Sequence, residues 1–489
     1  MAGGSWIGID IGTSGVKAAL IDESGAVRTA TDAPLSVSRP RPGWSEQAPD
    51  DWWTATLAAM DALAAAEPAL MRGARGIGLS GQMHGATLLD AADRPLRPCI
   101  LWNDARSGAE CAALDARADF RGIGGNLVMA GFTAPKLEWV RVHEPEIFAQ
   151  VATVLLPKDY VRLLLTGERL SDMSDAAGTL WMDVGARDWS DALLEATHLS
   201  RAQMPGLVEG SAPAGRLRPD LAARWGMAAA PVVAGGGGDN AASACGVGAV
   251  RPGEGFLSIG TSGVLFLVTE RFAPNTDSAV HAFCHAIPDT WHQMGVILSA
   301  ADSLSWLGRI TGRKPADLAA SVDPAAEPDE DVLFLPYLSG ERTPLADPDA
   351  RGAFIGLSQA SGPEALARAV LEGVAFAFAD CADALKAGGA GEIGTLAAVG
   401  GGAHSDTWLQ MTADATGLTL ARIADSGHGA ALGAARLGFC AAEGADPREV
   451  RRPAPVLAEF APDPARADAV AARRARYRAA WPALRALRG

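Results

Sequence analysis

Apolar and polar positions along the chain follow two different periods. Short apolar runs bounded by turn residues predict strands, as at Gly76–Ser80 and Leu396–Val399. Longer segments with apolar residues three or four positions apart predict helices at Asp51–Ala66, Pro363–Leu385 and Thr407–Thr416. Since strands and helices follow one another along the chain, the pattern predicts an α/β architecture.

One strand–turn–strand pattern occurs twice. Residues 7–16 read IGIDIGTSGV and residues 255–264 read GFLSIGTSGV, and each leads into a second apolar run. The shared glycine and hydroxyl residues predict a tight hairpin turn, which two hairpins can share by chance. We favour a pair of phosphate-binding turns from two related halves, because glycine lets backbone N–H groups approach an anion closely.

The repeat also predicts how the chain divides. A length of 489 residues is enough for two or three domains. The segment 246–254 is rich in turn residues and lies just before the second hairpin. We therefore expect an N-terminal domain at 1–248 and a C-terminal domain at 249–489.

Composition excludes several classes of partner. The formal charge of −15 argues against nucleic acid and anionic membranes. No apolar run approaches the length of a membrane span, and Asp10 interrupts the apolar start of the chain, unlike a signal peptide. The six cysteines form no C-x-x-C pair, which favours reduced thiols and a cytoplasmic location. The arginine-rich segment 473–478 reads as a solvated terminal helix.

Two carboxylates stand out as candidate catalytic residues. Asp10 interrupts an apolar strand, where it either bonds to a neighbouring turn or holds Mg²⁺ beside the phosphate turn. Asp239 follows four consecutive glycines and opens an alanine-rich helical run with Asn240. Helix capping explains an Asp or Asn there, but four glycines suit a ligand that passes close to the backbone.

Further polar residues lie at the ends of predicted strands. Gln82 and His84 stand between glycines, and Trp102 offers an aromatic face nearby, as in sugar sites. The segment 399–406 places glycines between a strand and a helix, which suits a nucleotide. The chain has neither a P-loop motif nor a G-x-S-x-G elbow. A cluster of histidines and a cysteine matches no zinc pattern; it comprises His281, Cys284, His285 and His292.

The chain resembles the FGGY carbohydrate kinase family over nearly its whole length. One departure is the run of four glycines before Asp239, where the family has three, so the length of that loop differs. The resemblance rests on many segments, among them GIDIGTSGVK (8–17), WSEQ (44–47), GQMHGATLLD (81–90), LWND (101–104), GFTAPKL (131–137), LLPKDY (155–160), SDMSDAAGT (171–179), GGDNAA (237–242), SIGTSGV (258–264), FLPYLSGERTP (334–344) and VGGGAHS (399–405).

The resemblance implies an actin-like ATPase fold, with two ribonuclease-H-like α/β domains flanking a central cleft. It implies that Asp239 is the catalytic base, that Asp10 is a second catalytic residue, and that both carboxylates bind the metal. The remaining expected contacts are, for the sugar, Gln82, Met83, His84, Trp102, Asp239 and Asn240, and, for ATP, Thr13, Ser14, Lys17, Gly260, Thr261, Ser262, Gly401, Gly402 and Ser405.

The expected activity is phosphorylation of the ketopentose D-xylulose by ATP with Mg²⁺, with Asp239 as general base. A kinase of ribulose, glycerol or another polyol is the first alternative. A nucleotide-dependent switch without sugar chemistry is the second, and the sugar-site residues between Gln82 and Asp104 argue against it. A homodimer is left open as the state of assembly.

Overall fold

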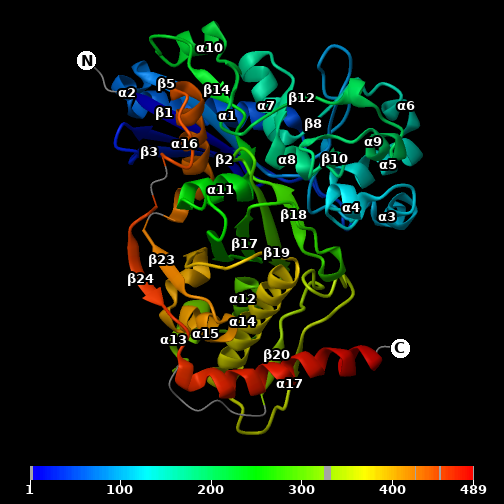
Figure 1. The fold of residues 1–489 in the computed structure, drawn as a ribbon, viewed down its shortest axis with the longest axis vertical. Helices are drawn as coiled ribbons and strands as arrows, with labels where there is room; N and C mark the ends of the chain where they lie inside the picture. Colours follow the sequence, from blue (N-terminus) through cyan, green and yellow to red (C-terminus); the bar gives the residue numbers. More distant parts are fainter. Residues whose placement is uncertain (1–3, 324–331, 425, 451–452, 488–489) are drawn as a thin grey trace.

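A computed structural model describes residues 4–323, 332–424, 426–450 and 453–487 as two lobes, each built on a seven-stranded sheet (Figure 1). The first sheet holds the N-terminal hairpin. Its spatial order is β13 (Pro213–Arg216), β14 (Val232–Ala234), β5 (Ala74–Gly81), β1 (Ser5–Ile11), β2 (Gly15–Asp22) and β3 (Val27–Pro34), with β15 (Gly237–Gly238) also paired to β5.

The second sheet repeats this plan. Its spatial order is β18 (His281–Cys284), β19 (Trp291–Ile297), β17 (Gly263–Thr269), β16 (Gly255–Ile259), β22 (Leu396–Val399), β23 (Leu420–Ile423) and β24 (Val456–Phe460).

The two sheets share one topology. In the first, β3, β2 and β1 are antiparallel and β5 and β14 then add in parallel. In the second, β19, β17 and β16 are antiparallel and β22 and β23 add in parallel. Two copies of this strand order confirm the predicted pair of ribonuclease-H-like units. The predicted hairpins are confirmed, with Ile11 opposite Val16 in the first and Ile259 opposite Gly263 in the second.

The predicted helices form within a few residues of their expected bounds. They are α1 (Pro49–Ala66), α14 (Pro363–Ala387) and α15 (Asp406–Thr416). Each buries a wide apolar face; Trp52 in α1 and Trp408 in α15 are almost fully buried. A long insertion between β5 and β14 carries β6 (Thr87–Leu89), α5 (Thr133–His143), β8 (Thr153–Leu155), α7 (Pro157–Thr166) and α8 (Met173–Ala177). No described helix is long and apolar enough to cross a membrane.

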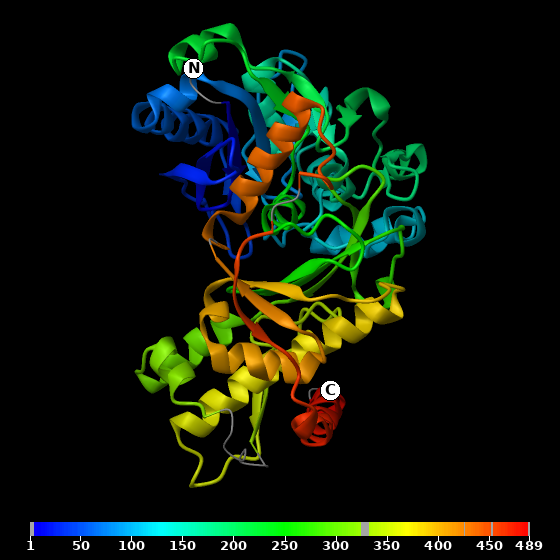
Figure 2. The same cartoon turned by 60° about the vertical axis from the view of Figure 1, so that its left-hand side comes forward.

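One helix from the C-terminal half covers the first sheet. Helix α16 (Gly429–Glu443) lies against β1, β5 and α11 (Asp239–Val247), and the views in Figures 1 and 2 place it inside the N-terminal lobe. The chain therefore returns to the first lobe between β23 and β24 of the second sheet, so a single cut near residue 248 does not separate two independent cores.

Glycines bring this helix into backbone contact with its neighbours. A Cβ at Gly8 on β1 would lie 1.8 Å from the carbonyl oxygen of Ala431. A Cβ at Gly433 on α16 would lie 1.7 Å from the carbonyl oxygen of Ala242 on α11. Both distances are impossible for a methyl group, so this packing depends on hydrogen at these positions.

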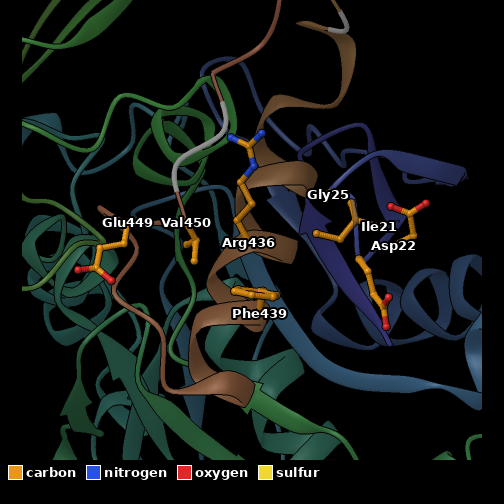
Figure 3. Close-up of a pocket in the computed structure, with 8 residues that line it drawn as sticks. Ile21, Asp22, Gly25, Arg436, Phe439, Glu449 and Val450 are labelled. Atoms are coloured by element: carbon orange, nitrogen blue, oxygen red, sulfur yellow. The ribbon is translucent and has the colours of Figure 1, made fainter. Parts of the chain in front are cut away.

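The outer side of α16 leaves a cavity of about 230 Å³ beside the turn after β2 (Figure 3). Arg436 and Phe439 of the helix, Asp22 at the end of β2 and Gly25 of the turn line it. Arg436 donates through Nη1 to the carbonyl oxygens at the end of α11, with N–O distances of 2.8 and 2.9 Å. A cation there complements the negative end of the α11 dipole.

The arginine-rich C-terminal segment is a helix, α17 (Ala467–Ala486), but it is not simply solvated as we expected. Arg473 is 8% exposed, and its Nε donates to the Glu372 carboxylate at 2.8 Å. Tyr477 and Trp481 on the same helix are also buried. The alternation of arginine and alanine gave no sign of a buried face in the sequence, because arginines of this face pair with carboxylates of α14.

We expect Gly433→Ala to lower the free energy of unfolding by about 2 kcal/mol or more, because an inserted methyl overpacks a backbone contact. Helix propensity alone predicts the opposite, since alanine favours a helix over glycine by about 1 kcal/mol. Gly429→Ala in the same helix is the matched control, because its nearest neighbour would be 3.7 Å away. Chemical unfolding of both variants measures the difference, and equal stabilities would contradict the contact.

Candidate functional site

A cavity of about 270 Å³ collects most of the predicted sugar-binding residues. It lies between the two halves, since β16–β19 of the second sheet contribute Ser262, Val264 and Met294 to its wall. Five of the six residues expected to contact the sugar line it; they are Met83, His84, Trp102, Asp239 and Asn240.

Asp239 is the first residue of α11, with Gly238 as the N-cap. Its carboxylate accepts hydrogen bonds from the backbone N–H and side-chain amide of Asn240, at 2.7 and 3.0 Å. Burial, and next the nearby negative charge of Asp10, raise the pKa of Asp239 to about 7. A carboxyl group with a pKa near neutrality is well matched to proton transfer.

Asp10 lies on β1, which pairs directly with β5. Ser80 of β5 donates its hydroxyl to Asp10 Oδ1 at 3.0 Å. Burial raises the pKa of Asp10, while the Ser80 hydrogen bond and the charge of Lys17 oppose that rise. The charge of Asp10 thus acts on Asp239, and the two carboxylates lie in one site. The structure thus brings Asp10 and Asp239 together as the sequence predicted.

His84 is held in a strained backbone conformation with a φ of 69°, which residues other than glycine rarely adopt. The buried Lys136 fixes it by donating to the carbonyl oxygens of His84 and Gly131, both at 2.7 Å. Burial is the main cause that lowers the pKa of the imidazole to about 3, so the ring is neutral. The positions of Met83 and His84 are thus set by packing, not by the turn alone.

Gln82 takes a different place from the one expected. Its side chain is buried, accepts from Thr13 Oγ1 at 3.0 Å and donates to Gln47 Oε1 at 2.9 Å. It does not line the cavity, and its geometry suits support of the first turn. Trp102 is 44% exposed, lines the cavity and donates from Nε1 to Thr13 Oγ1 at 3.0 Å. Thr13 therefore connects the first turn to the wall of the cavity.

The two phosphate-turn candidates face the region between the lobes with exposed hydroxyl residues. Ser14 and Thr261 are exposed, and Ser262 also borders the sugar cavity. Lys17 donates to the carbonyl oxygen of Gly427 at 3.0 Å, which engages its amine with the C-terminal half. Gly260 and Thr261 accept backbone hydrogen bonds from the start of α12 (Ala301–Thr311).

A second cavity, of about 420 Å³, surrounds the predicted nucleotide residues. Gly401, Gly402 and Ser405 line it between β22 and α15. Its opposite wall is apolar and comes from the helices after the second hairpin, with Ala301, Leu304, Ala316 and Ala319. Ser405 also caps α15 by accepting from the backbone N–H of Trp408 at 3.2 Å. A glycine edge facing an apolar wall suits a flat base.

Packing within the protein accounts for part of the glycine run before Asp239. A Cβ at Gly235 would lie 2.3 Å from the Glu209 carbonyl oxygen, and one at Gly236 would lie 2.1 Å from the Leu79 carbonyl oxygen. A Cβ at Gly238 would lie 2.9 Å from the side chain of Met83, and one at Gly237 would lie 3.1 Å from that of Ala286. The backbone contacts require glycine at positions 235 and 236, and close approach of a ligand to the loop stays a prediction.

Sequence reasoning missed the buried ions that hold this loop. Lys158 is fully buried, lies 2.9 Å from the Asp172 carboxylate and also contacts Asp159 and Asp175. Arg162 of the same helix donates to the carbonyl oxygen of Gly235, and the Ser174 hydroxyl accepts from the Gly238 N–H at 3.1 Å. The segments LLPKDY and SDMSDAAGT matched the family, but their spacing of charges gave no sign of a common cluster.

Arg342 and His281 also line the sugar cavity and were not predicted to do so. Arg342 lies in FLPYLSGERTP, a segment that carried the family resemblance without an assigned role. His285 and His292, from the histidine cluster, are instead buried around Phe266. Across the described ranges, no three His, Cys, Asp or Glu side chains are arranged to hold a metal.

Comparisons with known proteins agree over both halves of the chain. Models of the N-terminal and C-terminal domains of the FGGY family of carbohydrate kinases match residues 5–246 and 255–442. The xylulose kinase of Escherichia coli strain K12 is 55% identical over 442 residues, which cover 89% of this chain and 90% of that protein.

Two solved structures extend the likeness to the fold. The crystal structure of a xyloylose kinase from Brucella ovis is 55% identical, with a TM-score of 0.96, and covers 99% of this chain and 100% of that one. A xylulose kinase from Rhodospirillum rubrum is 28% identical, with a TM-score of 0.89 over 99% of each chain. This chain therefore belongs to the FGGY family of carbohydrate kinases and has their two-domain, actin-like ATPase fold.

Proposed function

We propose that this carbohydrate kinase transfers the γ-phosphoryl group of ATP to the terminal hydroxyl of D-xylulose. The observation that carries the proposal is the likeness to xylulose kinases at 55% identity across nearly nine tenths of both chains. The cavity supports it, because Met83, His84, Asp239 and Asn240 converge on a space of about 270 Å³, large enough for a pentose.

In this proposal Asp239 acts as the general base. The sugar lies in the cavity with its terminal hydroxyl toward the carboxylate, and ATP extends from the glycine-lined cavity at Gly401 and Gly402 toward the two turns. The hydroxyl oxygen attacks the γ-phosphorus, its proton passes to Asp239, and the bond to the ADP oxygen breaks. The protein mainly positions these groups and screens charge, as is usual in phosphoryl transfer.

The residues present fit Mg²⁺. Magnesium is usually held by one or two carboxylates together with substrate phosphates. Asp10 and Asp239 provide two partly buried carboxylates, and no lysine or arginine lies within ion-pair distance of either in the described part of the chain. When bound, Mg²⁺ would neutralise charge on the ATP phosphates. We propose that these two carboxylates hold it, directly or through water.

A substrate panel tests the proposed function. We expect D-xylulose to give the highest kcat/KM in a coupled ADP-release assay run beside D-ribulose, L-xylulose and glycerol. A higher value for one of the other three would reassign the substrate within the family. An ATPase rate that no sugar stimulates would contradict sugar kinase activity by the purified chain.

Asp239→Asn should lower kcat by about 10² to 10⁴, the usual contribution of a general base. The amide keeps the size of the side chain, so thermal unfolding should change little. Asp220→Asn is the control, because that carboxylate is exposed and lies on the surface helix α10 (Pro219–Arg224). Near-normal turnover by a folded Asp239→Asn protein would remove Asp239 from the mechanism.

The pH dependence of kcat/KM should show the titration of Asp239. Its pKa is about 7 in the free protein, and only the ionised form accepts a proton. We therefore expect kcat/KM for the sugar to fall about tenfold per pH unit below pH 7 and to level off above it. In Asp10→Asn, loss of a neighbouring negative charge should move this limb to lower pH. A profile that stays flat down to pH 5 would contradict the assignment.

A further inference from the structure

The sugar cavity contains a guanidinium that forms no ion pair within 4.0 Å. Arg342 lines the cavity from the second half of the chain, in the loop after β20 (Leu333–Leu335). Among the described residues, no carboxylate oxygen lies within 4.0 Å of its guanidinium nitrogens, although most arginines in this chain have such a partner. The neighbouring Glu341 carboxylate instead accepts from the backbone N–H groups of Arg342 and Leu298, at 2.8 and 3.0 Å. Burial lowers the pKa of Arg342 and the charge of Glu341 opposes this, but arginine stays charged in proteins.

The side chain of Arg342 is oriented by a neutral partner. Its Nη1 lies 3.2 Å from Nε2 of His281. On the other side of that ring, Nδ1 lies 2.8 Å from Oδ1 of Asn126. The Asn126 amide nitrogen donates to the carbonyl oxygens of Gly124 and Ala282, so Oδ1 is an acceptor and His281 Nδ1 carries the proton. Nε2 therefore accepts from Arg342, and the guanidinium keeps its full charge and its other N–H donors.

Arg342 and the Asp239 carboxylate line the cavity from different halves of the chain. A row of contacts along the cavity wall connects them. Met83 packs against Gly238, beside the carboxylate, and its side chain and the His84 ring both pack against Gly178. The His84 ring packs on Phe132 with centroids 4.7 Å apart, and Phe132 packs on His281 with centroids 5.6 Å apart. We call the two ends of this row of contacts the carboxylate end and the guanidinium end.

His84 adds an acceptor near the guanidinium end. Its Nδ1 lies 2.6 Å from the carbonyl oxygen of Gly178. Because a carbonyl oxygen only accepts hydrogen bonds, Nδ1 carries the proton, and the neutral ring keeps a lone pair on Nε2. The guanidinium end therefore presents a charged donor, Arg342, and a neutral acceptor, His84.

This pair matches the chemistry of an open-chain ketose. A ketopentose closes its ring through the same terminal hydroxyl that the kinase must phosphorylate. The reacting form therefore has an open chain with a free ketone carbonyl near its other end. That end consists of a carbonyl oxygen, which only accepts hydrogen bonds, next to a hydroxymethyl group, which can donate one. A pentitol has a hydroxyl in place of the carbonyl and lacks a dedicated acceptor.

We propose that Arg342 recognises the ketone carbonyl of the substrate, with His84 Nε2 accepting from the adjacent hydroxymethyl group, so that this end of the cavity selects the open-chain ketose. The inference rests on the proposed function and deepens it. It makes Arg342 a specificity-determining residue supplied by the C-terminal half to a sugar site built mostly by the N-terminal half.

The test compares a ketose with the two pentitols that differ from it only at the carbonyl carbon. D-Xylulose is assayed for kcat/KM, and xylitol and D-arabitol are assayed as competitive inhibitors against it. We expect Arg342→Met to lower kcat/KM for D-xylulose about 10- to 100-fold, the range for a lost hydrogen bond to a charged donor. The inhibition constants of the pentitols should change less than about threefold. Arg342→Lys, which keeps one charged donor, should recover part of the loss.

Controls separate this role from others. Arg313→Met removes an exposed arginine that pairs with Glu364, and it should leave all constants unchanged. Thermal unfolding reports whether each variant is folded. If Arg342→Met weakens pentitols as much as it weakens D-xylulose, or changes neither, the carbonyl assignment is overturned. If the proposed function itself were wrong, the unsubstituted protein would not phosphorylate D-xylulose at all. That result is distinct from any effect of Arg342→Met.

Discussion

The close contact of α16 with β1, β5 and α11 is the constraint on which the candidate active site depends. Asp10 belongs to β1 and Asp239 begins α11, so the distance between the two carboxylates is set by a helix that touches both elements. Gly8 and Gly433 allow backbone atoms to meet where a methyl group would not fit. Interiors are close-packed, so even one added carbon must displace an element that carries a carboxylate.

This contact also explains why the two halves work as one enzyme. The helix that covers the first sheet is encoded between β23 and β24 of the second sheet, and Lys17 bonds to Gly427 just before that helix begins. The second half also supplies Ser262 and Arg342 to the sugar cavity. The sugar cavity therefore needs residues of both halves, whereas the glycine-lined cavity is formed by residues of the second half.

The sequence predicted the features that depend on local pattern. The duplicated hairpins and the helices at α1, α14 and α15 have strong periodicity or turn chemistry, and all were found. It could not predict groups that long-range packing brings together. The Lys158 cluster joins two segments, the Gln82 side chain bonds to Gln47, and Arg342 comes from a distant loop. The glycines before Asp239 are visible in the sequence, but the backbone contacts that require two of them come from distant segments.

The charged groups of the cavity differ between its two parts. At the carboxylate end, burial and next the charge of Asp10 raise the pKa of Asp239, which favours uptake of a proton or a cation there. At the guanidinium end, Arg342 bonds to a neutral imidazole and keeps its charge available. A carbonyl dipole and a hydroxyl proton are the two features of an open-chain ketose that such unlike groups distinguish. In the proposed binding mode, the unlike groups therefore fix which way round the sugar lies, and so which hydroxyl reaches the proposed base.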